Sequence, residues 1–176
     1  MRFVKILPFV FCLFLSLHAA FASRIWNEMQ DLLKKKPAFH KVELLSNLPS
    51  YVKPEFVKSM PGSSFLALQN TEIQNLIKQT PAYLQFELQD GYHQKFELLL
   101  IRQDIYSPEA GVVCSDRPDI KEAMPREIVF YRGIIQNIPG SFAAITFSGN
   151  EIIGVLSLPE KGNLVLGKLI SQNSIS

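Results

Sequence analysis

The sequence predicts a mainly β fold, an antiparallel meander or sandwich-like sheet with an N-terminal amphipathic helix and one short additional helix. Residues 83–88 alternate apolar and polar side chains, which is the period of a half-buried strand. In the last third of the chain, turn-forming residues recur about ten residues apart between apolar runs, a spacing typical of a sandwich or an open barrel. The chain has 176 residues, 47% of them hydrophobic, which is enough for one domain with its own core.

Residues 1–22 have the pattern of a secretory signal peptide. Arg2 and Lys5 precede an apolar run of about a dozen residues, and a small-x-small pattern then places the cleavage site between Ala22 and Ser23. The alternative is a membrane anchor, but this run is short for a hydrocarbon layer of about 30 Å. We therefore expect a protein that is secreted or held in the periplasm or cell envelope, with no membrane anchor after the signal is removed.

Cleavage at this site would change both the charge and the cysteine content. It would remove two of the 18 basic residues and none of the 16 acidic ones, so that the formal net charge becomes zero. A neutral chain gives no electrostatic reason to expect nucleic acid or an anionic membrane as a partner. Cys12 would also leave, and Cys114 alone cannot form an intramolecular disulfide. The core must then hold the fold by burial alone.

Residues 23–80 are expected to form a helical and irregular N-terminal segment of the domain. A helix is predicted over 23–36, with Ser23 as its N-cap, Pro37 after its end, and one apolar face made of Ile25, Trp26, Met29, Leu32 and Leu33.

The lysines at 34–36 allow two interpretations. They could form a basic binding patch, or a solvated helix end that complements the helix dipole, and the charge pattern favours the second. Further along, Val42, Leu44 and Leu45 predict a short strand, and residues 71–78 predict a short helix that ends before Pro81.

Residues 81–170 are expected to form the antiparallel β core, followed by a polar tail at 171–176. A hairpin turn is predicted at Asp90 and Gly91, and residues 115–126 are expected to be an exposed connection. The apolar run at 96–101 predicts a strand that is covered on both faces. The expected strands are 83–88, 96–101, 112–113, 128–135, 142–147, 152–158 and 164–169.

The sequence does not contain the patterns of common catalytic or metal sites. After cleavage only His40 and His93 remain as histidines, and neither belongs to a zinc-binding His-Glu-x-x-His motif. The best catalytic pair is Cys114 with His93, since both fall near predicted strand ends, but nothing supplies an orienting third group. Glu109 and Asp116 lie in polar loops. We therefore expect no catalytic residue, no cofactor and no metal site.

Several segments from 83 to 169 together resemble a known family. Their order and spacing are similar to those of the pro-domain that precedes the zinc endopeptidase in reprolysin-like (ADAM-type) metalloproteases, in the version found in exported bacterial relatives. The similar segments are Phe86-Glu87-Leu88, Phe96 to Leu100, Asp104 to Pro108, Phe130 to Ile135, Pro139-Gly140-Ser141, Asn150 to Leu156 and Gly162 to Leu169. Tyr131, Gly133, Pro139, Ser141 and Gly154 are the residues that define the pattern.

The resemblance implies a non-catalytic domain that keeps a zinc metalloprotease latent or assists its folding, in cis or in trans. Members often carry a zinc-binding cysteine near the end of the pro-domain. Cys114 precedes the Tyr-x-Gly strand, so that role is not transferred to it. The sequence also ends at Ser176 without a protease domain or a multibasic processing site. The alternative is a free-standing secreted or envelope β-domain that serves as a binding or structural module.

Overall fold

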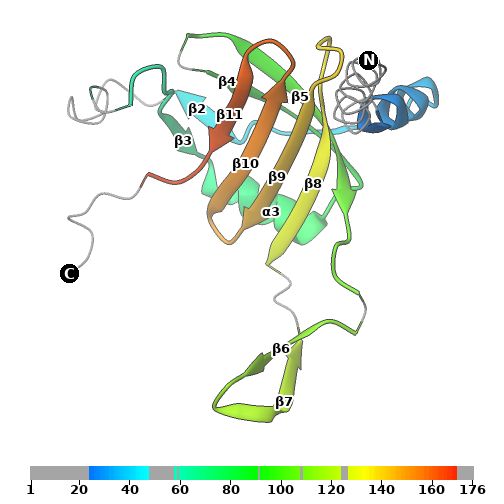
Figure 1. Ribbon diagram of the computed structural model, residues 1–176, viewed down its shortest axis with the longest axis vertical. Coiled ribbons are helices and arrows are strands. Elements are labelled where there is room, and N and C mark those ends of the chain that lie inside the picture. Colours follow the sequence, from blue (N-terminus) through cyan, green and yellow to red (C-terminus); the bar gives the residue numbers. More distant parts are fainter. Residues whose placement is uncertain are drawn as a thin grey trace, which may run out of the picture.

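The computed structural model describes residues 24–47, 58, 60–90, 92–107, 109–123 and 127–169. The predicted signal peptide, its cleavage site at Ala22 and Ser23, and the tail at 171–176 lie outside these residues. A seven-stranded sheet dominates the described part of the chain (Figure 1). The predicted mainly β fold is therefore confirmed.

The large sheet has the strand order β1-β4-β5-β8-β9-β10-β11. All neighbours are antiparallel except β1, which pairs in parallel with β4, so the sheet is mixed rather than purely antiparallel. The strands are β1 (His40–Lys41), β4 (Tyr83–Gln89), β5 (Lys95–Gln103), β8 (Ile128–Ile135), β9 (Phe142–Ser148), β10 (Glu151–Leu158) and β11 (Gly162–Leu166).

The strand predicted around Val42 is instead two short strands, one on each side of that residue. β1 joins the large sheet, and β2 (Leu45–Asn47) pairs with β3 (Leu66–Leu68) in a small separate sheet. The side chains of β1 are exposed, which explains why hydrophobic patterning gave no signal for this strand.

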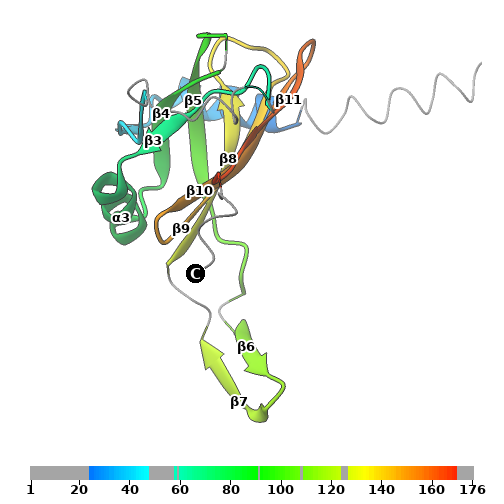
Figure 2. The ribbon, with the colours of Figure 1, turned by 90° about the vertical axis from the view of Figure 1, so that its left-hand side faces the viewer.

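One face of the large sheet carries the main core. Helix α3 (Asn70–Gln79) lies against this face (Figure 2) and confirms the predicted short helix. The helix buries Ile73 and Leu76, and Leu44 is buried in the same cluster. The sheet contributes alternate residues of its strands to this cluster: Leu84, Phe86, Leu88, Phe96, Leu98, Leu100, Val129, Tyr131, Ile135, Ala143, Ile145, Phe147, Ile152, Leu156 and Leu158.

The opposite face is covered in part by the N-terminal helix, which is helical over residues 24–34. Met29 from this helix forms a small buried cluster with Leu99 and Ile134, and the predicted apolar face of the helix packs around it. Leu98 and Leu100 are buried on the main core side and Leu99 on the helix side. Strand β5 is therefore covered on both faces, as its apolar run predicts.

The N-terminal helix ends slightly earlier than predicted. The amides of Lys35 and Lys36 bond to the carbonyls of Leu32 and Leu33, and Lys36 has a φ of 52°. A residue before proline avoids helical backbone angles. Pro37 therefore keeps Lys36 out of the helical conformation, and the helix ends before it. Lys34 pairs with Asp31 at 2.8 Å and is exposed, as expected for a solvated helix end.

A β-hairpin projects away from the large sheet between β5 and β8 (Figures 1 and 2). It consists of β6 (Gly111–Cys114) and β7 (Arg117–Ala123), which pair only with each other, and we call it the arm. The described side chains of residues 115–121 are exposed, as predicted for the connection over 115–126, but the segment also contains strand β7, which was not predicted. Proline and several charges indicate a loop there, but a hairpin with two exposed faces needs no buried apolar stripe.

The described part of the chain contains no helix that is long and apolar enough to cross a membrane.

Candidate functional site

Tyr131 is the first residue of the family-like pattern, and its side chain is buried in the main core. Its ring packs edge-on against Phe147 with 5.7 Å between centroids. Its hydroxyl donates a hydrogen bond to the carbonyl oxygen of Pro81 at 2.9 Å. Burial raises the pKa of Tyr131 to about 12, although the nearby Arg102 guanidinium acts in the opposite direction.

Arg102 forms a second hydrogen bond beside the one made by Tyr131, and no sequence pattern identified it. Its guanidinium Nη1 donates to the Thr80 carbonyl at 2.8 Å, directly before Pro81. Thr80 is the C-cap of α3 and has a left-handed backbone. Two strands of the sheet therefore hold the end of α3. Backbone carbonyl acceptors have no sequence signature, so neither partner could have been found from the sequence.

Gly133 of β8 lies close against the backbone of β5. A Cβ atom built there would lie 1.9 Å from the Leu99 carbonyl oxygen and 2.9 Å from the Leu100 Cα. Gly154 has a similar role between β9 and β10, where a Cβ would lie 2.4 Å from Ile145 Cδ1 and 2.8 Å from the Ala144 carbonyl oxygen. Both glycines are required because neighbouring backbone occupies the space of a side chain.

Pro139 and Ser141 belong to the connection between β8 and β9. Pro139 is exposed, and Gly140 after it has a φ of 74°. Ser141 is completely buried, and its hydroxyl accepts a hydrogen bond from the Ile135 amide at 3.0 Å and donates to the Ile135 carbonyl at 3.2 Å. The serine therefore takes the place of a strand partner at the end of β8. Tyr131, Gly133, Ser141 and Gly154 therefore have structural roles in or beside strands β8 to β10, whereas Pro139 is an exposed turn residue.

His93 and Cys114, the best catalytic pair that the sequence offers, do not lie near each other. His93 is exposed in the β4–β5 turn and has a φ of 64°. Cys114 is the last residue of β6, and the arm that contains β6 lies at the opposite end of the molecule from β4 and β5 (Figures 1 and 2). Glu109 and Asp116 are exposed as expected. No group of three or more potential metal-binding side chains occurs among the described residues.

The arm presents apolar side chains to solvent. Val113 and Ile120 are 52% and 50% exposed, and Val112 is 40% exposed. Ile105, in the segment between β5 and β6, is also exposed, while Tyr106 beside it packs edge-on against Phe130 of β8. A two-stranded hairpin is only marginally stable by itself in water. Exposed valine and isoleucine on such a hairpin are typical of a surface that contacts another protein.

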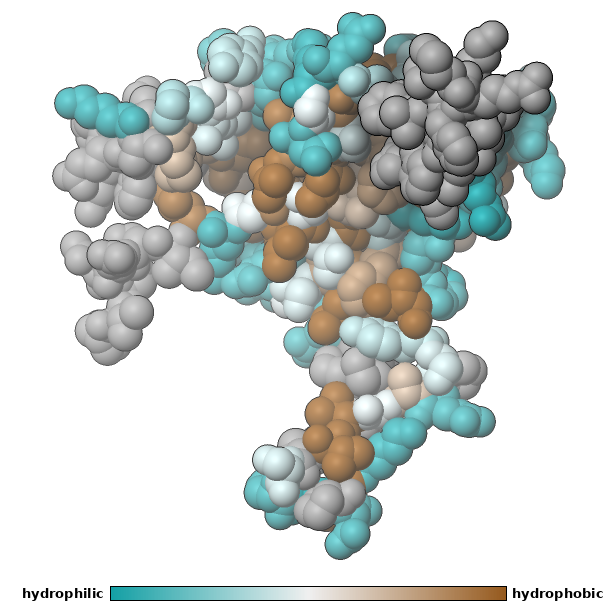
Figure 3. All heavy atoms as spheres, viewed as in Figure 1, coloured by the Kyte–Doolittle hydropathy of each residue, from teal (hydrophilic) through white to brown (hydrophobic). Residues whose placement is uncertain are grey.

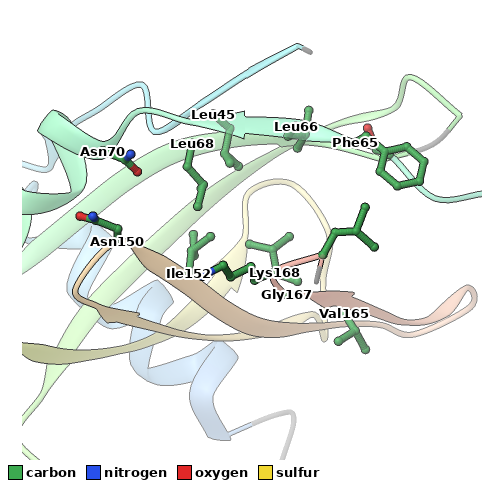
Figure 4. A pocket seen from close by; sticks show the side chains of 13 residues that line it. Leu45, Phe65, Leu66, Leu68, Asn70, Asn150, Ile152, Val165, Gly167 and Lys168 are labelled. Atoms are coloured by element: carbon green, nitrogen blue, oxygen red, sulfur yellow. The ribbon is translucent and has the colours of Figure 1, made fainter. Parts of the chain in front are cut away.

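A groove of about 520 Å³ lies between the small sheet and the strands β10 and β11. Figure 4 shows Leu66 and Leu68 on one wall and Ile152 on the other, whereas the Val165 side chain points away from the groove. Asn70 and Asn150 stand at one end of the groove, where the Gln74 side-chain amide donates to Asn150 at 3.0 Å. Most of the lining side chains are apolar, and Asn70, Asn150 and Lys168 add polar groups, so the groove is suited to a ligand that is largely apolar.

Comparison of the chain with protein-family models, with curated proteins and with solved structures found no match.

Proposed function

We propose that this chain is a propeptide-like domain that binds a zinc endopeptidase of the reprolysin type, keeps it latent or assists its folding, and is not itself catalytic. The observation that carries the proposal is the pattern from Tyr131 to Gly154. Tyr131 and Ser141 form hydrogen bonds with the backbone, and Gly133 and Gly154 lie where neighbouring backbone leaves no room for a side chain. The fold requires these residue types at these positions. This requirement supports a common fold with the family that the sequence resembles.

The arm is the part that we propose to contact the protease. Its strands β6 and β7 have no further strand partner among the described residues, so both outer edges remain open for pairing. Extended chains commonly bind proteins by adding a strand to an open edge, with alternate side chains entering pockets. Val113 and Ile120 are exposed on this hairpin and would supply such side chains.

Latency then follows from mass action. A domain that binds only the native protease stabilises it and blocks its cleft, and a covalent tether would raise the effective concentration of the domain. Export through the predicted signal peptide would bring the domain to the compartment in which such proteases act.

The test is a titration of a recombinant reprolysin-type catalytic domain, taken from the same organism, with the purified chain. Hydrolysis of a fluorogenic peptide is expected to fall in a saturable manner. Val113→Lys is expected to weaken inhibition by about tenfold or more, as for a buried apolar contact at an interface. Ile153→Lys is the matched control, since Ile153 lies on β10 and is exposed to the same degree, 51% against 52%. Full protease activity at saturating concentrations of the folded chain would refute the inhibitory role.

The groove beside β11 favours a second candidate, a free-standing secreted or envelope β-domain that binds another protein. The described edge of β11 and the apolar groove offer a binding surface that is independent of the arm. Affinity capture with the wild-type chain and the Val113→Lys variant separates the two candidates. Capture of a protease only by the wild-type chain supports the first, and capture of the same non-protease partner by both supports the second.

A further inference from the structure

Strand β11 forms an open edge of the large sheet. It pairs with β10 on one side and has no strand partner on the other among the described residues. Alternate backbone N–H and C=O groups of an edge strand point away from the sheet, and they form a template for another strand. The opposite edge is β1, which has two residues against the five of β11 and offers much less backbone for pairing.

Apolar side chains accompany this open edge on both faces of the sheet. On the outer face Val165 is 76% exposed, and Ile153 of β10 is exposed as well. Figure 3 shows hydrophobic side chains gathered on this face of the molecule, over the strands near β11. On the inner face, Leu166 lines the apolar groove of about 520 Å³ together with Leu66 and Leu68 of β3. Natural edge strands are usually protected by charges or covered, so an apolar edge of this kind indicates a partner.

We propose that the partner is a second copy of this chain, whose β11 adds antiparallel to the first across a two-fold axis near Leu164. In that register Gly162 of one copy lies opposite Leu166 of the other, and Asn163 lies opposite Val165. The same surface is used by both copies, as in most closed dimers. The pairing joins the two seven-stranded sheets into one and partly covers Val165.

The charges that flank β11 complement one another in this register. The turn before β11 carries Glu160, and the segment after β11 carries Lys168; both are exposed. Antiparallel pairing about Leu164 brings the turn of one copy beside Lys168 of the other, and the symmetry forms this contact twice. Lys161, the other charge of the turn, instead donates a hydrogen bond to Gln94 near the β4–β5 turn.

Lys168 is already held in position at this edge. Its ammonium group forms an ion pair with Glu151 at 2.7 Å, and both side chains are about half exposed. The contact fixes the lysine at the end of β11 and leaves part of it accessible to a second carboxylate. Because β11 has a negative charge before it and a positive charge after it, a second β11 in antiparallel orientation places opposite charges together at both ends. An extended chain without this charge pattern would not gain these contacts.

Sedimentation velocity of the purified protein, over micromolar to near-millimolar concentrations, tests the proposal. A monomer–dimer equilibrium is expected for the wild-type chain. Glu160→Lys and Lys168→Glu are each expected to weaken dimerisation about tenfold, since two attractive contacts become repulsive. The combination of the two changes restores opposite charges and is expected to recover most of that loss. Lys78→Glu, at an exposed position of α3, is the control and is expected to dimerise like the wild type.

Val165→Lys gives a second measurement that does not depend on the ion pair. The side chain is mostly in solvent, so the monomer is expected to fold normally by circular dichroism, and lysine protects an edge strand from pairing. This variant is expected to be monomeric at concentrations where the wild type is dimeric. A wild-type chain that is monomeric at every concentration would overturn the proposal. So would a dimer that tolerates Val165→Lys, or a monomer whose β11 pairs with a peptide from another protein.

Discussion

The hydroxyl of Tyr131 lies 2.9 Å from the carbonyl oxygen of Pro81 and donates a hydrogen bond to it. Tyr131 is on the central strand β8, and Pro81 follows the end of α3. With Arg102, which donates to the adjacent Thr80 carbonyl, this contact fixes α3 against the sheet. The aromatic residue of the Tyr-x-Gly pattern is therefore a structural anchor that joins the helix to the sheet.

Tyr131→Phe is expected to lower the free energy of unfolding by about 1–2 kcal/mol, because it removes a hydrogen bond and leaves the Pro81 carbonyl without this donor. Urea denaturation followed by Trp26 fluorescence measures the change. Tyr92→Phe is the matched control, since the Tyr92 side chain is 81% exposed. Equal stabilities of the two variants would show that the contact with Pro81 contributes nothing.

The stability of the wild-type domain is expected to fall between pH 10 and pH 12. Tyr131 has a pKa raised by burial to about 12 in the folded state, against about 10 in an unfolded chain. The unfolded state therefore loses its proton first as the pH rises. The contribution of this group is fully present below pH 10 and is lost as the pH passes through the folded pKa. Melting temperatures across this range should decline less steeply for Tyr131→Phe than for the wild type.

Ser141→Ala is expected to destabilise the domain by about 1–3 kcal/mol, because the amide and the carbonyl of Ile135 both lose a buried partner. Hydrogen exchange is the most specific measurement, since the Ile135 amide should exchange faster in the variant. Ser64→Ala serves as the control because Ser64 is exposed. Unchanged protection of the Ile135 amide would contradict the assigned hydrogen bonds.

Replacement by alanine is expected to lower the stability of the domain most at Gly133, less at Gly154 and least at Gly167. Gly133→Ala should be the most damaging, because its Cβ would overlap the backbone of β5. Gly154→Ala should cost about 1–3 kcal/mol, since the flexible tip of Ile145 can yield although the Ala144 carbonyl cannot. Gly167→Ala is the control, because a Cβ there meets no atom within 4 Å. Thermal unfolding of the three variants tests the order.

The meander from β8 to β11 could be predicted well from the sequence. Strand β8 has the predicted bounds, and β9 and β10 agree within one residue, because turns and alternating burial mark each of them. Strand β11 ends earlier, at Leu166, although the apolar pattern continues to Leu169. The alternation of apolar residues and the turn residues were enough to predict these strands, because each strand pairs with the next one in sequence.

The parts that depend on distant pairing could not be predicted. Strand β1 pairs in parallel with β4, more than 40 residues later, through exposed residues that leave no apolar pattern. Strand β7 was missed because Pro118 and its charged neighbours resemble a loop. The anchor of α3 depends on backbone acceptors at Thr80 and Pro81, which any sequence could supply. The residues of the family-like pattern were identified, but their roles became clear only from their contacts.

Direct binding tests most simply whether the domain recognises a zinc endopeptidase. Titration calorimetry of the purified chain into a reprolysin-type catalytic domain from the same organism is the measurement. We expect saturable binding with one domain per protease, weakened by Val113→Lys on the arm and unchanged by Ile153→Lys on the sheet. Absence of binding between the two folded proteins at high micromolar concentration would contradict it.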